Sequence, residues 1–345
     1  MSVAAPSVTI AAETPPAPGA RVRVAEGIDW VRPPLPFALD HVNCWLLGAS
    51  GGANDPIGDD ATLIDTGIAS ERARALWHKA LGGGTPSRLL VTHFHPDHTG
   101  LAADFAARGA ALLGNAVEIA FARRVWLTDD AAYGTRYAEW YARHGLPPEA
   151  VERVRAVGNG YRRIVAEPPV PEAWRTLADG DEVELGERRF RVLAGRGHAP
   201  EMLLLHDPAD GVLIAADQVL PTISPNVSIM PSTPDPDPLA SFLATLERLR
   251  ELPAETLVLP SHGLPFRGLH ARLDALAAHH AERLAALGRA SVEPVTAFEL
   301  FPALFRRELD AQQRSFALGE TLAHLAHGER FERVEDEGIV RWRRV

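Results

Sequence analysis

Short apolar segments separated by turns fill residues 21 to 115 of the chain. Each segment, such as 61–64 or 88–91, is bounded by Gly, Pro or polar residues, a pattern typical of buried β-strands. Similar segments return later in the chain, at 182–185, 189–193, 212–216 and 257–261. Gly186-Glu187 separates the first two of these as a turn. The pattern therefore predicts a protein rich in strands with helices between them.

A long polar segment with helical periodicity interrupts these strands. Ninety-nine residues separate His98 from His198, more than a simple strand-and-helix connection needs. Most of the excess, about 116–177, predicts an inserted helical subdomain.

After residue 265 the pattern becomes helical again. A helix beginning at Asp237-Pro238 and ending near Leu252 comes before this region. Helices are predicted at 269–287, near 296–306 and at 311–327, and a β-hairpin at 331–334 and 339–345. Helices followed by a terminal hairpin resemble a winged-helix module, so 266–345 is expected to form a separate C-terminal region.

Composition limits the class of protein. The 345 residues are 46% hydrophobic, and no run of 18 apolar residues predicts a membrane span. Residues 1–20 are rich in Ala and Pro and lack a basic start, which predicts a disordered tail rather than a secretory signal. The single cysteine, Cys44, excludes an internal disulfide and is expected to be a packed thiol. A cytoplasmic protein is the expectation.

Charge argues against a nucleic-acid partner. The net charge is −10, from 35 Lys and Arg against 45 Asp and Glu. Binding to nucleic acid relies on basic residues that neutralise phosphates. Residues 266–345 contain 12 Arg and 12 Asp or Glu, so that region has no basic excess either. We therefore expect a small-molecule substrate.

The candidate chemistry begins with four polar side chains in a run of six residues. His93, His95, Asp97 and His98 form an H-x-H-x-D-H cluster directly after the predicted strand 88–91. Imidazole nitrogens and carboxylates are ligands that suit zinc, iron or manganese. A His-rich polar turn is the alternative interpretation, so the case depends on further ligands elsewhere in the chain.

Four more residues stand at the same kind of position. Asp65, His198, Asp217 and His262 each follow a short apolar run and precede Gly, Pro or a polar loop. The ordered set of Asp, then H-x-H-x-D-H, then His, Asp and His resembles the metallo-β-lactamase superfamily over roughly residues 21–265. One departure is Ala216, where the superfamily usually has glycine before the aspartate; it changes one methyl group and no ligand.

The resemblance implies an α+β four-layer αββα sandwich with its ligands at one edge, where strands end. It also implies two metal sites: His93, His95 and His198 in the first, Asp97, His98 and His262 in the second, and Asp217 bridging both. Two divalent ions, expected to be Zn²⁺ with Fe or Mn as alternatives, would then activate water for hydrolysis. Asp97 and Asp65 are the candidate catalytic carboxylates, Asp65 as a hydrogen-bond partner of a ligand.

Two segments are candidates for choosing the substrate. Tyr133, Tyr137, Trp140 and Tyr141 share one face of a helix in the insertion. This stripe either forms an aromatic wall over the metals or docks the insertion on the core or on a second subunit, which leaves a homodimer open. The loop after Asp217 supplies Thr222, Ser224 and Asn226 as candidate contacts, and a rigid connector is the alternative.

The leading functional hypothesis is a dinuclear hydrolase of a small thioester, ester or lactone, similar to hydroxyacylglutathione hydrolases. A metal-dependent endoribonuclease or phosphodiesterase is second, and an iron-dependent oxidoreductase of the same fold is third. A non-enzymatic relative is disfavoured because a costly cluster of charged groups has no reason to assemble without metal. The other nine of the 14 histidines are not expected to be ligands: His279, His280, His324 and His327 are expected on exposed helical faces, and His41, His78, His144, His206 and His270 lack a partner at ligand spacing.

Overall fold

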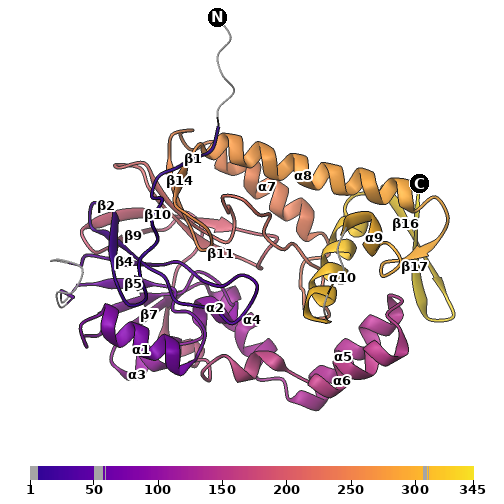
Figure 1. Cartoon of the computed structure of the whole chain (residues 1–345), viewed down its shortest axis with the longest axis horizontal. Coiled ribbons are helices and arrows are strands. Elements are labelled where there is room, and N and C mark those ends of the chain that lie inside the picture. Colours follow the sequence, from indigo (N-terminus) through magenta and orange to yellow (C-terminus); the bar gives the residue numbers. More distant parts are fainter. Residues whose placement is uncertain (1–6, 50–56, 59, 306–308, 310) are drawn as a thin grey trace, which may run out of the picture.

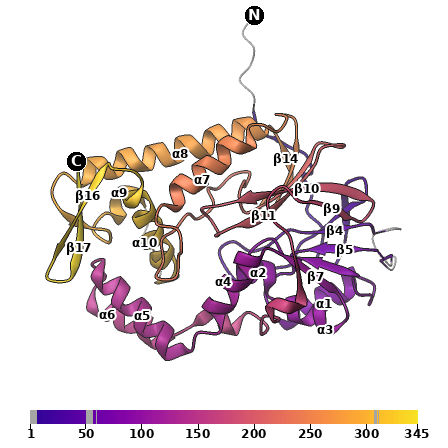
Figure 2. The same cartoon turned by 180° about the vertical axis from the view of Figure 1, so that it is seen from behind.

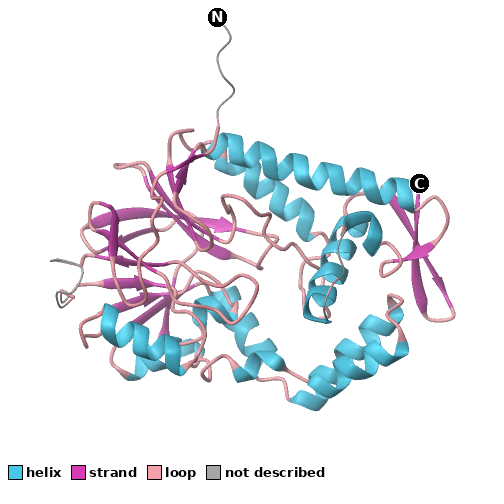
Figure 3. Cartoon of the chain, in the orientation of Figure 1, coloured by secondary structure: helices cyan, strands magenta, loops and turns pink. Residues whose placement is uncertain are grey.

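Two seven-stranded sheets account for most of the short apolar segments. The structure, a computed structural model of the chain, describes residues 7–49, 57, 58, 60–305, 309 and 311–345. Both sheets are mixed. They pack face to face at one end of the molecule, with helices on their outer faces (Figures 1 and 3). A third, three-stranded sheet lies at the other end.

The first sheet brings the end of the strand before the candidate ligands and the end of the strand before Asp65 to one edge. Its spatial order is β2 (Val22–Ala25), β3 (Ile28–Val31), β4 (Cys44–Leu47), β5 (Thr62–Ile64), β6 (Arg88–Leu90), β7 (Ala111–Gly114) and β8 (Trp174–Thr176). Strands β5 to β8 run parallel. The residues that follow β5 and β6 therefore emerge at the same edge.

The second sheet supplies the remaining strand ends. Its order is β1 (Thr9–Ile10), β14 (Phe266–Arg267), β13 (Leu257–Pro260), β12 (Val212–Ala216), β11 (Met202–Asp207), β10 (Arg188–Gly195) and β9 (Glu182–Leu185). Only β12 and β13 pair in parallel among the described strands of this sheet, so their carboxyl ends lie together.

Three apolar layers hold the sheets and helices together. Between the sheets, Trp30 and Trp45 of the first pack in one buried cluster with Phe190 and Leu203 of the second. Helices α1 (Glu71–Ala80) and α3 (Ala102–Ala107) cover the outer face of the first sheet. Helices α7 (Pro238–Leu249) and α8 (Leu269–Ala290) cover the second (Figures 1 and 2). The predicted αββα sandwich is confirmed.

The region predicted as a helical insertion contains helices and one strand. It comprises α4 (Ala116–Trp126), α5 (Asp130–Arg143), α6 (Pro148–Val157) and the 3₁₀ turns η1 (Gly160–Arg163) and η2 (Pro171–Ala173). Strand β8, which falls before the predicted limit at residue 177, pairs with β7. The end of the predicted insertion therefore belongs to the first sheet, because sequence periodicity does not reveal this edge strand.

The C-terminal region packs α8 against two further helices and a small sheet. Its elements are β15 (Val295–Thr296), α9 (Phe301–Leu304), α10 (Ala311–Ala326), β16 (Phe331–Asp336) and β17 (Ile339–Arg344). The terminal hairpin is present, and β15 adds a third strand to it. Residue 306 of the helix expected near 296–306 lies outside the described residues. The winged-helix character of the C-terminal region stays a prediction.

Of two expectations from composition, one agrees with the structure and one is wrong in part. Cys44 is fully buried on β4, and burial raises the pKa of its thiol well above the usual value, as expected of a packed thiol. The tail prediction for residues 1–20 is wrong in part, because Thr9–Ile10 pair with β14; residues 1–6 lie outside the described residues. Among the described helices, none is long and apolar enough to cross a membrane.

Candidate metal centre and adjoining cavity

The candidate ligands gather where strands of both sheets end. The H-x-H-x-D-H run follows β6 and includes the short helix α2 (Pro96–Thr99). The segments after β10, β12 and β13 supply His198, Asp217 and His262. At β12 the turn requires Ala216 to adopt a left-handed conformation with φ of 44°. A left-handed conformation is costly for residues other than glycine, which gives a physical reason for glycine at this position in the superfamily.

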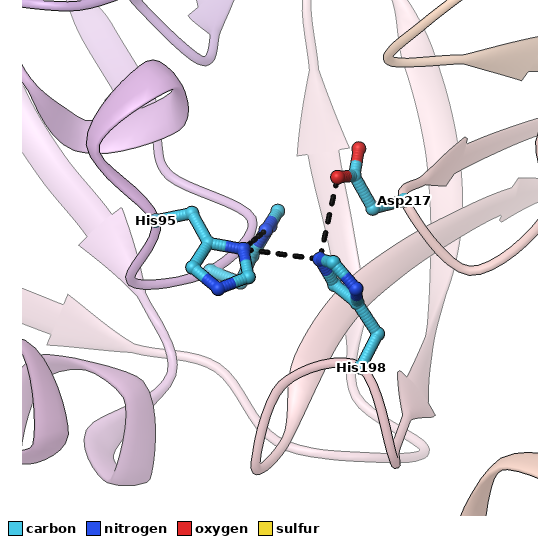
Figure 4. Close-up of side chains that lie close together, drawn as sticks. His95, His198 and Asp217 are labelled. Carbon is cyan, nitrogen blue, oxygen red and sulfur yellow. Dashed lines mark hydrogen bonds and ion pairs between the residues drawn. The ribbon is translucent and has the colours of Figure 1, made fainter. Parts of the chain in front are cut away.

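Four side chains form a first group of ligand atoms. His95 Nδ1 lies 2.9 Å from His93 Nε2 and 3.0 Å from His198 Nε2 (Figure 4). Asp217 Oδ2 is 3.3 Å from His198 Nε2. One ligand atom from each of the four residues lies within 4.8 Å of the others. Such spacing matches donors arranged around one cation.

A second group adjoins the first. Asp97 Oδ2 lies 3.6 Å from His98 Nε2 and 3.4 Å from His262 Nε2. Asp217 Oδ1 lies 3.6 Å and 3.5 Å from the same two nitrogens. The two oxygens of Asp217 therefore face different groups, as a bridging carboxylate would.

Hydrogen bonds to the opposite ring nitrogen orient the histidines. His198 Nδ1 bonds the backbone oxygen of Asn226 at 2.8 Å, and His262 Nδ1 bonds that of His41 at 2.7 Å. His98 Nδ1 lies 2.8 Å from Asp65 Oδ2. A carbonyl or carboxylate partner fixes the proton on Nδ1 and leaves Nε2 directed at the centre. Sequence reasoning missed the roles of His41 and of the Asn226 backbone.

The two groups differ in their protonation. Burial lowers the pKa of His95 to about 3 and that of His93 well below its usual value, so both imidazoles are neutral. Burial disfavours charge on His98 as well, but Asp97, Asp65 and Asp217 outweigh it and raise its pKa to about 9. The carboxylates of Asp217 and Asp97 likewise outweigh burial at His262 and raise its pKa, Asp217 above all.

The donor set fits a bound cation. Asp217 Oδ1 and His98 Nε2 are both buried and have no hydrogen-bond partner among the described residues. Three imidazole nitrogens of the first group also converge on one another. Buried polar atoms are rarely left unpaired, and a divalent ion with nitrogen and oxygen ligands would satisfy them.

Asp65 lies beside the second group. Its φ of 62° is left-handed and turns the chain after β5 so that the carboxylate faces Thr92 and His98. This is the partnership with a ligand histidine predicted from the sequence.

Glu118 is a functional candidate that sequence reasoning missed. On α4, its Oε2 accepts a hydrogen bond from Phe94 N at 2.9 Å, and its Oε1 accepts one from Glu201 N at 2.6 Å. It thereby joins the loop that carries His93 and His95 to the one that carries His198. Burial raises the pKa of Glu118 to about 7. An isolated glutamate in a helical segment gives no sequence signal of this kind.

A partly open cavity lies beside the first group. His95 and His198 form part of its wall. Much of the rest is apolar or aromatic: Phe94, Phe121, Val125, Tyr137, Tyr161, Met230 and Phe316. No Lys or Arg belongs to the described lining, and Asp235 is its only carboxylate.

The predicted substrate residues are divided between this cavity and other contacts. Tyr137 and Asn226 line the cavity, and Tyr133 stacks on Tyr137 with ring centres 4.0 Å apart. Tyr141 bonds Ser315 of α10 through its hydroxyl. Trp140 packs edge-on against Tyr141, with ring centres 5.0 Å apart.

The loop residue Ser224 is not part of the described lining of this cavity. Its Oγ lies 3.3 Å from His280 Nε2 on α8. His280 and His324 are fully buried and paired at 3.0 Å, which corrects their expected exposure. These contacts place Ser224 in packing between the loop and the C-terminal helices.

Comparison with known proteins decides the family. The model of the "Metallo-beta-lactamase superfamily" matches residues 38–262. The chain belongs to the metallo-β-lactamase superfamily. A model described as "Metallo-beta-lactamase-like, C-terminal domain" matches residues 284–345. Family membership and the metal-binding geometry together make the chain a hydrolytic enzyme of this fold.

Solved structures of the superfamily cover nearly the whole chain. A beta-lactamase domain protein from Burkholderia ambifaria is 41% identical, with a TM-score of 0.84 and coverage of 97% of each chain. A metallo-beta-lactamase family protein from Thermus thermophilus is 31% identical, with a TM-score of 0.78, covering 94% of this chain and 100% of that one. The superfamily inferred from the ligand motifs is confirmed.

Curated relatives are more distant. Acyl-coenzyme A thioesterase MBLAC2 of Gallus gallus is 27% identical over 256 residues, which cover 69% of this chain and 78% of the relative. The protein of the same name from Homo sapiens is 25% identical over 257 residues, covering 69% and 79%.

Proposed function

We propose that this metallo-β-lactamase-fold hydrolase cleaves a small acyl thioester, ester or lactone with two divalent metal ions, expected to be zinc. The observation that carries the proposal is the convergence of seven His and Asp side chains in two adjoining groups that share Asp217. The thioesterase names of the curated relatives favour a thioester among the three substrates.

When bound, two such ions would generate a nucleophile from water near neutral pH and polarise the substrate carbonyl oxygen. The ligands for these ions would all come from the chain itself. His93, His95 and His198 offer nitrogen lone pairs toward one point, and Asp217 supplies negative charge to both groups. Water adds to the acyl carbon, the bond from that carbon to sulfur breaks, and the products are a carboxylic acid and a thiol.

The charge of the cavity supports an acyl substrate over a phosphodiester. Phosphate recognition generally uses Arg or Lys, and neither belongs to the described lining. The net charge of zero over residues 266–345 also disfavours RNA as substrate. A metal-dependent nuclease or phosphodiesterase is therefore the second candidate, and an iron-dependent oxidoreductase the third.

Metal analysis of the purified protein, followed by a substrate panel, tests the proposal. The panel contains acyl thioesters, lactones, a phosphodiester and RNA, each assayed with metal-loaded and metal-depleted protein. We expect metal-dependent cleavage of the acyl substrates only. Cleavage confined to the phosphodiester or RNA, or iron content with oxygen consumption, would overturn the proposal.

Two single variants and a control separate the groups. His93→Ala should weaken mainly the first metal site, and His98→Ala mainly the second. His78→Ala is the control, because this exposed histidine on α1 belongs to neither ligand group. Equal metal loading in all three variants would contradict the assignment.

A further inference from the structure

We infer that the cavity beside His95 and His198 binds the acyl chain of the substrate as an uncharged, apolar group, and that its aromatic walls limit the chain length accepted. The inference rests on the proposed function for the reaction, but it concerns a binding site of its own. The cavity begins at two imidazoles of the first group, so a carbonyl held at the metals would direct its chain into it.

Several polar side chains of the wall are already engaged with one another or with the backbone. Ser228 Oγ donates to Asn226 Oδ1 at 2.8 Å, and the Tyr137 hydroxyl lies 3.3 Å from Ser232 Oγ. Thr233 Oγ1 accepts from Met230 N at 2.8 Å. Groups that satisfy each other do not need a polar ligand. The surface left for a ligand is therefore mainly aromatic and aliphatic.

The charge of the wall excludes an anionic chain. Asp235 is the only carboxylate in the described lining, and it accepts hydrogen bonds from Asp237 N and Ser241 Oγ. No Lys or Arg belongs to the described lining, and Arg124 outside it is already engaged with the Phe121 ring and the backbone oxygen of Ser232. A carboxylate or phosphate at the end of the chain would therefore lack a cationic partner within the lining. An alkyl or aryl group carries no charge that would need a partner, and its burial in the cavity is favourable.

Two positions control the shape of the cavity. Val125 on α4 is buried in the wall, with 5% of its surface exposed. Phe316 on α10 is the most exposed aromatic residue of the lining, at 39%. A larger side chain at Val125 would shorten the space, and a smaller one at Phe316 would open it toward solvent. These two residues are therefore the ones we expect to determine chain length.

A binding experiment tests the site without catalysis. Primary alcohols of increasing length are titrated into metal-depleted protein as uncharged probes, and the dissociation constant is measured by calorimetry. Each added methylene should tighten binding roughly fourfold until the cavity is filled. Val125→Phe should move this limit to shorter alcohols, and Phe316→Ala should weaken the dependence on length.

The matched control is Val117→Phe, the same substitution at a position on α4 that is 45% exposed and outside the lining. It should leave the length profile unchanged. Alcohol binding that is independent of length, or a profile that is the same in Val125→Phe and the native chain, would overturn the inference. If Val125→Phe fails to fold, the Phe316→Ala profile decides the question alone.

A series of acyl thioesters with one common thiol then distinguishes this inference from the proposed function. If kcat/KM follows the same length profile as alcohol binding, both stand. If alcohols bind with the expected profile but no thioester is cleaved, the proposed function fails and the acyl site stands. If all thioesters are cleaved equally, whatever their length, the acyl site fails and the proposed function stands.

Discussion

Asp65 shows how one carboxylate can fix a ligand and its backbone together. It accepts hydrogen bonds from Thr92 N and Thr92 Oγ1, each at 2.8 Å, besides its contact with His98. The same side chain therefore anchors the start of the ligand loop and sets the direction of one imidazole. The residue therefore supports the geometry of the candidate metal centre without belonging to either ligand group.

Asp65→Asn should lower the affinity of the second metal site by about 10–100-fold. The amide keeps one acceptor oxygen, but its NH₂ group would face Thr92 or His98, so the imidazole loses its fixed direction. Competition with a chelator measures the affinity. Asp60→Asn, which changes an exposed carboxylate, is the control. An unchanged affinity in Asp65→Asn would show that the bond does not support the site.

Metal loading should depend on pH through His98 and His262. Without metal, the raised pKa values, about 9 for His98, keep these side chains protonated at neutral pH. A metal needs the neutral imidazole, so binding at pH 7 should release about two protons per chain, and affinity should fall as the pH decreases from about 9. Calorimetry in buffers of different ionisation enthalpy measures the release. Heats that do not vary with the buffer would contradict this prediction.

At this scale the sequence predicted the candidate ligands but not their surroundings. His93, His198 and Asp217 follow apolar strands and have recognisable types and spacing. By contrast, Glu118 and the backbone oxygens of His41 and Asn226 contribute only through contacts distant in sequence. Such contacts have no local pattern, since any residue can offer a backbone oxygen.

Among the elements, α4 links the metal loops to the insertion. Asn115 caps its first turn by accepting from Val117 N at 2.8 Å, and this fixes Glu118 in the same turn. The Glu118 carboxylate then joins the two ligand loops. The helix is thus part of the support of the metal centre, although it belongs to the predicted insertion.

Glu118→Ala should lower the free energy of unfolding by about 2 kcal/mol, because it removes the acceptors of two partly buried backbone N–H groups. It should also weaken metal binding, since the loops bearing His95 and His198 lose their connection. Chemical denaturation and metal titration measure the two effects. Glu139→Ala, at an exposed position on α5, is the control. If Glu118→Ala lost stability but kept its metal affinity, Glu118 would stabilise the fold without supporting the metal site.

The aromatic residues of α5 contribute both to the cavity and to packing against other parts of the chain. Tyr137 lines the cavity, whereas Tyr141 bonds Ser315 of the C-terminal region, and Trp140 packs on Tyr141 and the same apolar cluster. Sequence periodicity identified a shared face, but it gave the whole face one role. One helical face can contact two structures because it extends over several turns.

Trp140→Ala and Tyr137→Ala should therefore have different effects. Trp140→Ala should cost about 2 kcal/mol of stability, below the range for a fully buried aromatic because this ring is half-buried, and leave KM unchanged. Tyr137→Ala should change KM and chain-length preference. Thermal unfolding and steady-state kinetics measure the two. A KM change in Trp140→Ala alone would reverse the assignment.

In the whole molecule, the C-terminal region fixes the loop after Asp217 through hydrogen bonds. Arg272 of α8 donates to the backbone oxygens of Leu220 and Ile223, and Ile229 N donates to Gly319 O of α10 at 3.0 Å. The same loop contains Asn226, whose backbone oxygen orients His198. A region with a separate family match thus contributes to the position of a candidate ligand.

The αββα layers could be predicted because the order of the ligand motifs resembles that of a superfamily with this fold, whereas the apolar segments alone predicted only strands with helices between them. The edge strand Thr9–Ile10 could not, because two residues in an Ala- and Pro-rich segment gain strand structure only by pairing with β14. The buried pair of His280 and His324 was missed for a related reason. Their helices carry polar residues that become buried only when α8, α10 and the loop pack together.

The central claim is that two metal ions share Asp217. Elemental analysis of the native chain and of Asp217→Asn, with thioester hydrolysis measured on the same samples, tests it most directly. The account predicts two metal equivalents per native chain, and loss of metal from both sites together with activity in the variant, because the bridging charge is removed. A native chain with one equivalent, or an Asp217→Asn variant that is fully loaded and active, would contradict it.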